Sequence, residues 1–248
     1  MAIRDTGRAP PHTDYVGFVI RQKGYWEVRE AHAVAQLAGH EGLPAGGGHF
    51  IDVGAHAGWY SFLFAFHGYA VLAIEPSARN RLAMRATLCM NPLIAPRVTI
   101  VPHALGAERA PRRCALRTWN NADGNGVLDC DVDSTSPCGT GARARCSGPA
   151  CVCEPVTTST LNRVIQTHLA DGPSWRSSAV VAKLDVEGNE CAVLRGGSLL
   201  FTKLKADYIQ YEGLRANTTA CMKRHAARYG YRIGTARGQD QNTVMYKI

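Results

Sequence analysis

Apolar and polar positions alternate with two different periods from about residue 25 onward. Runs of β-branched and apolar residues predict buried strands, and apolar residues three or four positions apart predict amphipathic helices. The predicted strands cover residues 49–53, 70–74, 97–101, 113–119, 179–185 and 206–211, and the predicted helices cover 26–40, 59–66, 78–89, 158–168 and 217–229. Strands separated by helices favour an α/β fold, with a mostly parallel twisted sheet and helices on both faces.

Two further short strands are predicted at residues 231–233 and 243–248. The polar connection between them is too short for a crossover helix, so we expect a C-terminal antiparallel hairpin. The strand at 113–119 is expected at or near an edge of the sheet.

The periodicity disappears between residues 120 and 155, where Gly, Asp, Ser, Pro and Cys dominate. This stretch is too long for an ordinary connection and indicates an active-site loop or a surface insertion. The predicted organisation is a partly disordered lead at 1–23 and a single domain at 24–248, with a Cys- and Gly-rich insertion at about 120–155.

Chemically informative residues follow three of the predicted strands. Gly54 and Gly58 open a turn after the first strand, and Glu75 follows Gly54 by 21 residues at the end of the second. A glycine turn lets the backbone approach a ligand, and an acid at this distance holds ribose hydroxyls in nucleotide-binding folds. The apolar strand at 179–185 ends at Asp185, followed by Glu187. Because ligands bind beyond the carboxyl ends of parallel strands, these residues predict one site.

The predicted ligand carries a nucleoside but no diphosphate. Neither the dinucleotide fingerprint G-x-G-x-x-G nor the phosphate loop G-x-x-x-x-G-K-[ST] is present. Acids at the strand ends repel phosphate and attract a cation. S-adenosylmethionine (SAM) has a ribose, a sulfonium and an ammonium group, and it fits this pattern better than NAD, the cofactor of a competing oxidoreductase hypothesis.

Four motifs resemble those of the FkbM-type methyltransferases. They are D-V-G-A-H-A-G-W-Y-S at 52–61, A-I-E-P-S-A-R-N at 73–80, H-A-L-G at 103–106 and K-L-D-V-E-G-N-E at 183–190, and G-Y-W-E at 24–27 is also similar. The resemblance implies a Rossmann-like class I methyltransferase fold and SAM-dependent methylation, in the better-known members at hydroxyl oxygens. His56 stands where the family usually has Asn, and the insertion at about 120–155 is longer and richer in cysteine.

The resemblance also implies which residues form the site. Asp185 and Glu187 are expected to border the methionine end of the cofactor or the acceptor. The residues predicted to bind the cofactor are Glu27, Asp52, Gly54, Ala55, His56, Gly58, Tyr60, Ser61, Glu75, Asn80, His103, Ala104 and Asp185.

A hydroxyl acceptor must lose its proton as the new bond forms, so a general base is needed. The candidates are His56, His103, Asp185 and Glu187. Asp185 and Glu187 alternate along an extended chain, so one is expected to face the site while the other caps the next helix. No metal site is therefore predicted.

The charge and hydropathy of the chain limit the classes of partner that we expect it to bind. The formal net charge of +8 is spread along the chain without interleaved aromatic residues, so nucleic-acid binding is unlikely. No apolar run is long enough to span a membrane, and the N-terminus lacks the apolar core of a signal peptide, so a cytoplasmic location is expected. The predicted acceptor is a hydroxyl of a small molecule or glycan. The alternatives are an RNA or protein acceptor, or a catalytically inactive SAM-binding module.

Five of the nine cysteines lie within 24 residues: Cys130, Cys138, Cys146, Cys151 and Cys153. Their spacing matches no paired zinc motif. Reduced thiols are the default for a cytoplasmic chain, whereas an oxidising compartment would favour disulfides. Asn217-Thr218-Thr219 is a glycosylation sequon, but a helix begins there, so we interpret Asn217 as its N-cap.

Overall fold

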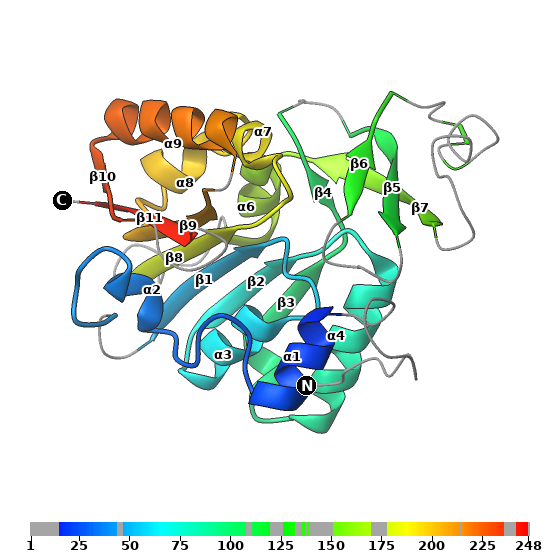
Figure 1. Cartoon of the computed structure of the whole chain (residues 1–248), viewed down its shortest axis with the longest axis horizontal. Helices are drawn as coiled ribbons and strands as arrows, with labels where there is room; N and C mark the ends of the chain where they lie inside the picture. The colour runs from blue at the N-terminus through cyan, green and yellow to red at the C-terminus, as the bar shows by residue number, and fades with distance from the viewer. Residues whose placement is uncertain are drawn as a thin grey trace.

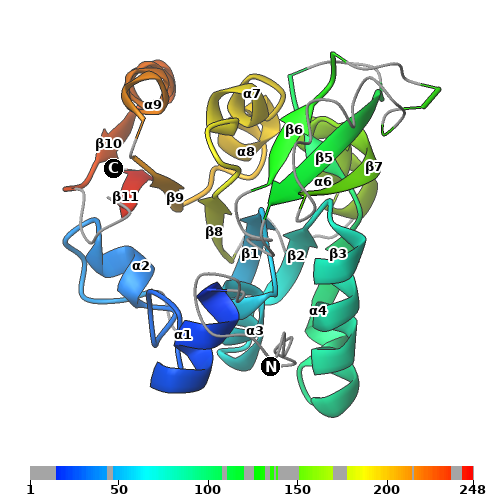
Figure 2. The same cartoon turned by 45° about the vertical axis from the view of Figure 1, so that its right-hand side comes forward.

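The computed structural model describes residues 15–43, 47–107, 111–119, 126–131, 135–136, 138, 151–169, 178–213, 215–235 and 242–247. Within these ranges the chain forms two sheets and the helices that pack on them (Figures 1 and 2). Cys146 lies outside them. No described helix is both long enough and apolar enough to cross a bilayer.

The larger sheet has seven strands in the order β10-β11-β9-β8-β1-β2-β3. Strands β8, β1, β2 and β3 run parallel with β9, while β11 pairs antiparallel with β9 and β10. The parallel sheet with a C-terminal antiparallel hairpin is therefore confirmed. The strands are β1 (Gly48–Val53), β2 (Ala70–Ile74), β3 (Val98–Val101), β8 (Ala179–Leu184), β9 (Tyr208–Glu212), β10 (Tyr231–Ile233) and β11 (Asn242–Lys247).

Helices cover both faces of this sheet, as the apolar strands require (Figure 1). On one face, side chains such as Val34, Phe64 and Met84 pack on Phe50 and Val181. On the other face, Leu161 and Met222 belong to the cluster around Ile51. The helices are α1 (Tyr15–Lys23), α2 (Ala33–Gln36), α3 (Trp59–Phe66), α4 (Ala78–Met90), α6 (Leu161–Leu169), α7 (Glu190–Arg195), α8 (Ser198–Thr202) and α9 (Ala216–Tyr229), with a 3₁₀ turn at Ala95–Arg97.

One predicted element needs correction near the N-terminus. The helix expected at 26–40 is reduced to α2, because Trp26 and Val28 form an isolated antiparallel bridge around Glu27, whose φ of 54° is incompatible with a helix. The segment expected as a partly disordered lead contains α1, and its residues 1–14 lie outside the described ranges.

A second sheet of four strands, in the order β4-β7-β5-β6, was not foreseen. Its strands are β4 (Ala104–Leu105), β5 (Arg113–Trp119), β6 (Val127–Asp129) and β7 (Cys151–Ser159). The prediction that residues 113–119 lie at an edge of the main sheet is wrong, because β5 pairs with β7 on one side and β6 on the other. Part of the region expected to be an irregular insertion is thus strand.

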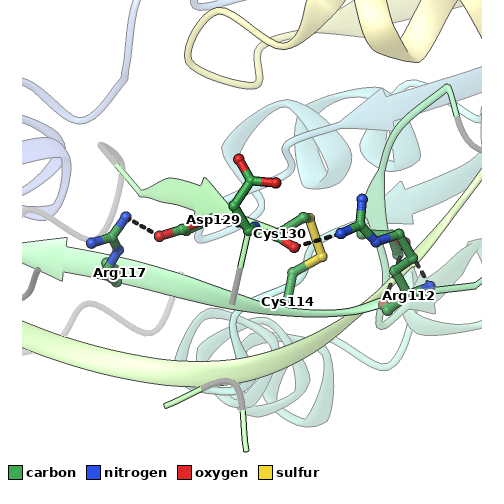
Figure 3. The surroundings of a disulfide bond; sticks show 7 residues. Arg112, Cys114, Arg117, Asp129 and Cys130 are labelled. Atoms are coloured by element: carbon green, nitrogen blue, oxygen red, sulfur yellow. Dashed lines mark hydrogen bonds and ion pairs between the residues drawn. A yellow bond between two sulfur atoms is a disulfide. The ribbon is translucent and has the colours of Figure 1, made fainter. Parts of the chain in front are cut away.

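Disulfides and one ion pair hold this small sheet together (Figure 3). Cys114 of β5 is bonded to Cys130 just after β6, and Cys138 to Cys153 of β7. Three residues further along β5, Arg117 pairs with Asp129 at 2.7 Å, with both side chains buried. The default expectation of reduced thiols is wrong for Cys130, Cys138 and Cys153. The antiparallel pairing of β5 with β6 brings Cys114 and Cys130 together, and Cys151 is also disulfide-bonded.

Removing the Cys114–Cys130 disulfide should lower the free energy of unfolding. Its partners are 16 residues apart, and closing a loop of this size is worth about 3 kcal/mol. We expect a loss of about that size for the double variant Cys114→Ala/Cys130→Ala in urea unfolding. Cys89 is exposed and free, so Cys89→Ser is the matched control, with a change within about 0.5 kcal/mol. Equal losses in both variants would contradict the assignment.

Candidate functional site

The register of the parallel strands sets the position of the site. Val53 of β1 lies beside Ile74 of β2 and Leu184 of β8, and Ile74 lies beside Val101 of β3. Four strands therefore end in one row. The residues that follow them, among them Gly54, Glu75 and Asp185, emerge at the same edge of the sheet.

The turn after β1 requires glycine at two positions. Gly54 has a φ of +82°, and a Cβ there would overlap the main-chain oxygen of Asp185. Gly58 has a φ of +88°, and a Cβ there would lie 2.6 Å from the ring of Phe62. The first glycine allows the turn to lie against the loop after β8, and the second allows α3 to start close to its own first turn.

Glu75 is buried, and its carboxylate collects three donors. The backbone N–H groups of His56 and Ser77 donate to it at 2.8 Å each, and the Asn80 side chain donates at 3.2 Å. Burial raises the pKa of Glu75 to about 7, against these hydrogen bonds, which lower it. The carboxylate thus ties the glycine turn to the start of α4 and titrates close to neutral pH.

The loop after β8 presents two further carboxylates. Asp185 donates its N–H to the Val53 carbonyl, which fixes the start of this loop. Burial, reinforced by the charge of Asp185, raises the pKa of Glu187 to about 7, and Arg215 opposes that shift. Both acids line the same cleft. The expectation that one of them caps the next helix is therefore not met.

The cap-like role belongs to Glu190. Its buried carboxylate accepts hydrogen bonds from the N–H groups of Val186 and Gly188, at 3.1 and 3.0 Å, and from the Thr218 hydroxyl. An acid in the first turn of a helix also interacts favourably with the helix dipole. Through its hydrogen bonds, Glu190 fixes the conformation of the loop after β8, residues 185–189, which we call the acid loop, and anchors it to α9.

Lys183, one residue before the end of β8, is the buried cation of the site. Its Nζ lies 2.7 Å from Asp185 Oδ2 and 4.9 Å from the centre of the Tyr60 ring. Burial lowers the pKa of Lys183, but the carboxylates of Asp185 and Asp52 outweigh burial and raise it above its ordinary value. Lys183 therefore carries a positive charge beneath the acid loop. The sequence did signal this buried cation, as a lysine within an otherwise apolar strand, but it was not among the predicted site residues.

Buried polar side chains extend from Lys183 across the adjacent strands and onto α3. Asp52 lies beside Lys183 in β1, is 1% exposed and accepts a 2.7 Å hydrogen bond from Ser61. Burial raises the pKa of Asp52, and Lys183 opposes this. In β9, Gln210 lies beside Lys183 and donates to the Tyr60 hydroxyl at 3.0 Å.

The same network reaches the N-terminal segment. The Tyr60 hydroxyl donates to Glu27 at 2.8 Å, and Asn242 of β11 donates to the same carboxylate oxygen at 3.3 Å. The motif G-Y-W-E is thereby joined to the site through side chains. Gln210 and Asn242 were not predicted, because strands β9 and β11 carry no recognisable motif.

A cleft of about 720 Å³, partly open to solvent, lies over the strand ends. Its wall opposite the main sheet comes from the small sheet, which contributes Leu116, Gly126 and Leu128. Leu116 and Leu128 pack in the same cluster as the bonded pair Cys114 and Cys130. This wall was missed, because sequence around residue 126 has neither strand nor helix periodicity.

The structure divides the predicted residues into two groups. Those that line the cleft are Gly54, His56, Glu75, His103, Ala104, Asp185 and Glu187. Those that do not line it are Glu27, Asp52, Ala55, Gly58, Tyr60, Ser61 and Asn80. Of the second group, Asn80 donates a hydrogen bond to Glu75, and Glu27, Asp52, Tyr60 and Ser61 belong to the buried polar network around Lys183.

Backbone strain also concentrates at the site. Among the described residues, Glu27, His56, Glu187 and Lys205 are the non-glycine residues with φ in the left-handed region. Three of these four belong to the predicted site. Because such conformations are costly and persist where the surroundings impose them, their clustering is typical of a functional site.

His103 follows β3 at the opposite end of the cleft from the acid loop. Burial lowers its pKa, so its ring is neutral at pH 7. Its Nδ1 has no hydrogen-bond partner among the described residues. The same part of the structure contains no group of three His, Cys, Asp or Glu side chains arranged to hold a metal ion.

The family model for the methyltransferase FkbM domain matches residues 52–233, well over half of the chain and every motif after G-Y-W-E. The chain belongs to the FkbM methyltransferase family. It is therefore placed among methyltransferases. No curated protein sequence is significantly similar to it.

One solved structure supports the fold, and a second is similar at a lower score. A methyltransferase FkbM from Methylobacillus flagellatus KT matches with a TM-score of 0.54 and 13% identity, over 88% of this chain and 48% of that chain. This FkbM chain thus spans about half the length of that relative. A methyltransferase from Geobacter sulfurreducens matches with a TM-score of 0.46 and 14% identity, over 97% of this chain and 90% of that one. The predicted Rossmann-like class I methyltransferase fold is confirmed.

Replacing the buried cation should destabilise the protein. Lys183→Met leaves Asp52 and Asp185 without their partner, and removing one member of a buried ion pair costs about 3–5 kcal/mol. We expect that loss in the free energy of unfolding measured with urea. Lys203→Met, at an exposed lysine, is the control and should change stability by less than about 0.5 kcal/mol. A Lys183→Met variant as stable as this control would show that the network is not held by its charge.

Proposed function

We propose that this FkbM-family protein is a SAM-dependent methyltransferase that acts on a hydroxyl oxygen of a small molecule or glycan. The observation that carries the proposal is Glu75, a buried carboxylate between the glycine turn and the cleft. A carboxylate there can accept hydrogen bonds from both hydroxyls of a ribose.

The strand order β8-β1-β2-β3 supports one orientation of the ligand in the cleft. Glu75, after β2, lies between the acid loop after β8 and the residues after β3. Asp185 and Glu187 suit the ammonium and sulfonium groups. Ala104 and Leu105, with Leu116 and Leu128 across the cleft, suit the flat apolar faces of an adenine.

The glycine turn supports the same assignment. A side chain at Gly54 would push the turn away from the acid loop, so the close approach that a nucleoside needs depends on this residue. NAD fits less well, because its diphosphate would have to lie near the carboxyl groups of Asp185 and Glu187. The same acids disfavour an RNA backbone as acceptor.

When bound, SAM supplies an electrophilic methyl group whose leaving group is a neutral thioether. The protein then has two tasks: to align the acceptor and to remove its proton. Glu187 is our choice for the base, because it lines the cleft and its pKa of about 7 suits proton transfer at neutral pH. Asp185 is paired with Lys183 and so is better suited to attracting the cation.

The histidines have other tasks under this proposal. His56 contributes its backbone N–H to Glu75, so its position in the turn matters more than its ring. His103 lies at the adenine end, where its Nδ1, unpaired among the described residues, can meet the base. Both were candidates for the general base, and their positions favour cofactor binding.

Glu75→Ala should weaken the binding of SAM and of S-adenosylhomocysteine. Losing hydrogen bonds to a charged acceptor costs about 1.5–3 kcal/mol, which corresponds to roughly ten- to hundredfold in affinity. Isothermal titration calorimetry measures this directly. Glu41→Ala, at an exposed acid, is the control and should bind as the unmodified protein does. Tight binding of NAD with none of SAM would falsify the proposal.

SAM affinity should rise with pH through about 7. The folded-state pKa values of Glu75 and Glu187 are raised to about 7, so both are mostly protonated at about pH 6 and mostly ionised at about pH 8. A cation and ribose hydroxyls prefer the ionised forms, so each group contributes up to roughly tenfold over this range. Calorimetry across the range checks the trend.

Glu187→Gln separates the two contributions to this pH dependence. The variant cannot ionise at position 187, so its affinity should rise less steeply with pH than that of the unmodified protein. Affinity that is independent of pH in the unmodified protein would contradict the assigned roles of both carboxylates.

A further inference from the structure

The start of α9 presents an asparagine whose side chain has no structural task. The sequence had favoured Asn217 as the N-cap of this helix, and this is wrong: Arg215 occupies the N-cap, and no side chain caps the helix there. Asn217 lies inside the first turn and is exposed. Its side chain makes no hydrogen bond to any described residue. The sequon Asn217-Thr218-Thr219 therefore has no competing explanation as a capping motif.

The cysteines provide the second, independent observation. Of the cysteines in the described ranges, all but the exposed Cys89 are disulfide-bonded. The printed pairs join Cys114 to Cys130, Cys138 to Cys153, and Cys191 of α7 to Cys221 of α9. Bonds of this kind persist in oxidising compartments and are rare in the cytosol. The number of disulfide-bonded cysteines therefore argues against the cytoplasmic location expected from the sequence.

We propose that the chain folds in an oxidising, secretory-type compartment and that Asn217 is there a site of N-linked glycosylation. The donor is a lipid-linked oligosaccharide diphosphate. The amide nitrogen of Asn217 forms a bond to the anomeric carbon of the sugar, and the bond from that carbon to the diphosphate oxygen breaks. The amide loses one proton and the lipid diphosphate leaves, with no oxidation or reduction. This proposal is independent of the methyl acceptor.

The contacts of the sequon place the modification before folding is complete. In the folded protein the Thr219 hydroxyl donates to the Gly213 carbonyl and the Thr218 hydroxyl donates to Glu190. About one helical turn after Asn217, the bond between Cys221 and Cys191 of α7 stabilises this arrangement. Acceptor sequons are typical of accessible loop segments. Glycan transfer is therefore expected while the segment is still extended, before α9 docks on α7.

A glycan at this position is compatible with the site. Asn217 is exposed and is absent from the cleft lining, although Thr218, the next residue, supports the acid loop through Glu190. The buried threonine points inward and the exposed asparagine points to solvent. A sugar chain on Asn217 thus extends away from the protein and leaves the cleft open.

The test is secretion of the full chain, behind a cleavable leader, from a eukaryotic cell. Peptide mapping and gel mobility before and after peptide-N-glycosidase should show a glycan on Asn217 that the enzyme removes, leaving a carboxylate at that side chain. Asn217→Gln and Thr219→Ala should abolish the shift. Thr219→Ser is the matched control and should keep it, because serine retains the hydroxyl that the sequon requires.

Two results would overturn the proposal. The first is secreted protein of unchanged sequence in which Asn217 carries no glycan. If secretion fails, the glycan is assayed on the chain translocated into microsomes, and its absence there overturns the proposal. The other concerns the compartment. Labelling of the unreduced, secreted protein with a thiol reagent should modify Cys89 and leave Cys191 and Cys221 unlabelled, and labelling of that pair would contradict an oxidised fold.

Discussion

A positive charge buried beneath the edge of the sheet holds the site together. Lys183 lies between Asp52 in the neighbouring strand and Asp185 at the start of the acid loop. Burial raises the pKa of Asp52, and the charge of Lys183 opposes that shift, because a buried carboxylate without a partner is costly. Lys183 therefore lets the structure keep negative charge at a strand end that is otherwise apolar. The same cation contacts Tyr60, which links it to Glu27 and so to the N-terminal segment.

The main sheet was predictable because its strands are short, apolar and separated by strong helical patterns. β2 and α3 begin and end at the predicted residues, and β1 and β8 do so within one residue. That the residues after these strands meet at one edge was also predictable, since parallel strands end in one row. The 26–40 segment was not, because Glu27 has a backbone conformation that no local pattern indicates. Lys183 was missed because hydrophobic periodicity predicts the strand from its apolar residues and gives no information about a single lysine among them.

The small sheet shows where sequence reasoning ends. β6 and β7 pair with β5 across a stretch with no regular pattern, and their pairing depends on disulfides and on the Arg117–Asp129 ion pair. Cysteine spacing does not reveal which thiols are bonded. Yet this sheet supplies the wall of the cleft opposite the glycine turn, through Leu116 and Leu128. The sequence departs most from the FkbM family pattern around residues 120–155. The part of the site built near this segment is therefore also the part stabilised by disulfides.

The raised pKa values of Glu75 and Glu187 connect stability to ligand binding. In the unfolded chain both carboxyls ionise near their ordinary pKa of 4.5, whereas in the fold they ionise near 7. Each carboxyl therefore contributes to the free energy of unfolding, and this contribution is fully present below about pH 4.5. It is lost as the pH rises through about 7. At neutral pH and above, the unliganded site holds carboxylates that its surroundings do not fully compensate. A cationic ligand with donor hydroxyls supplies the missing partners, so the destabilisation of the empty cleft becomes affinity for such a ligand.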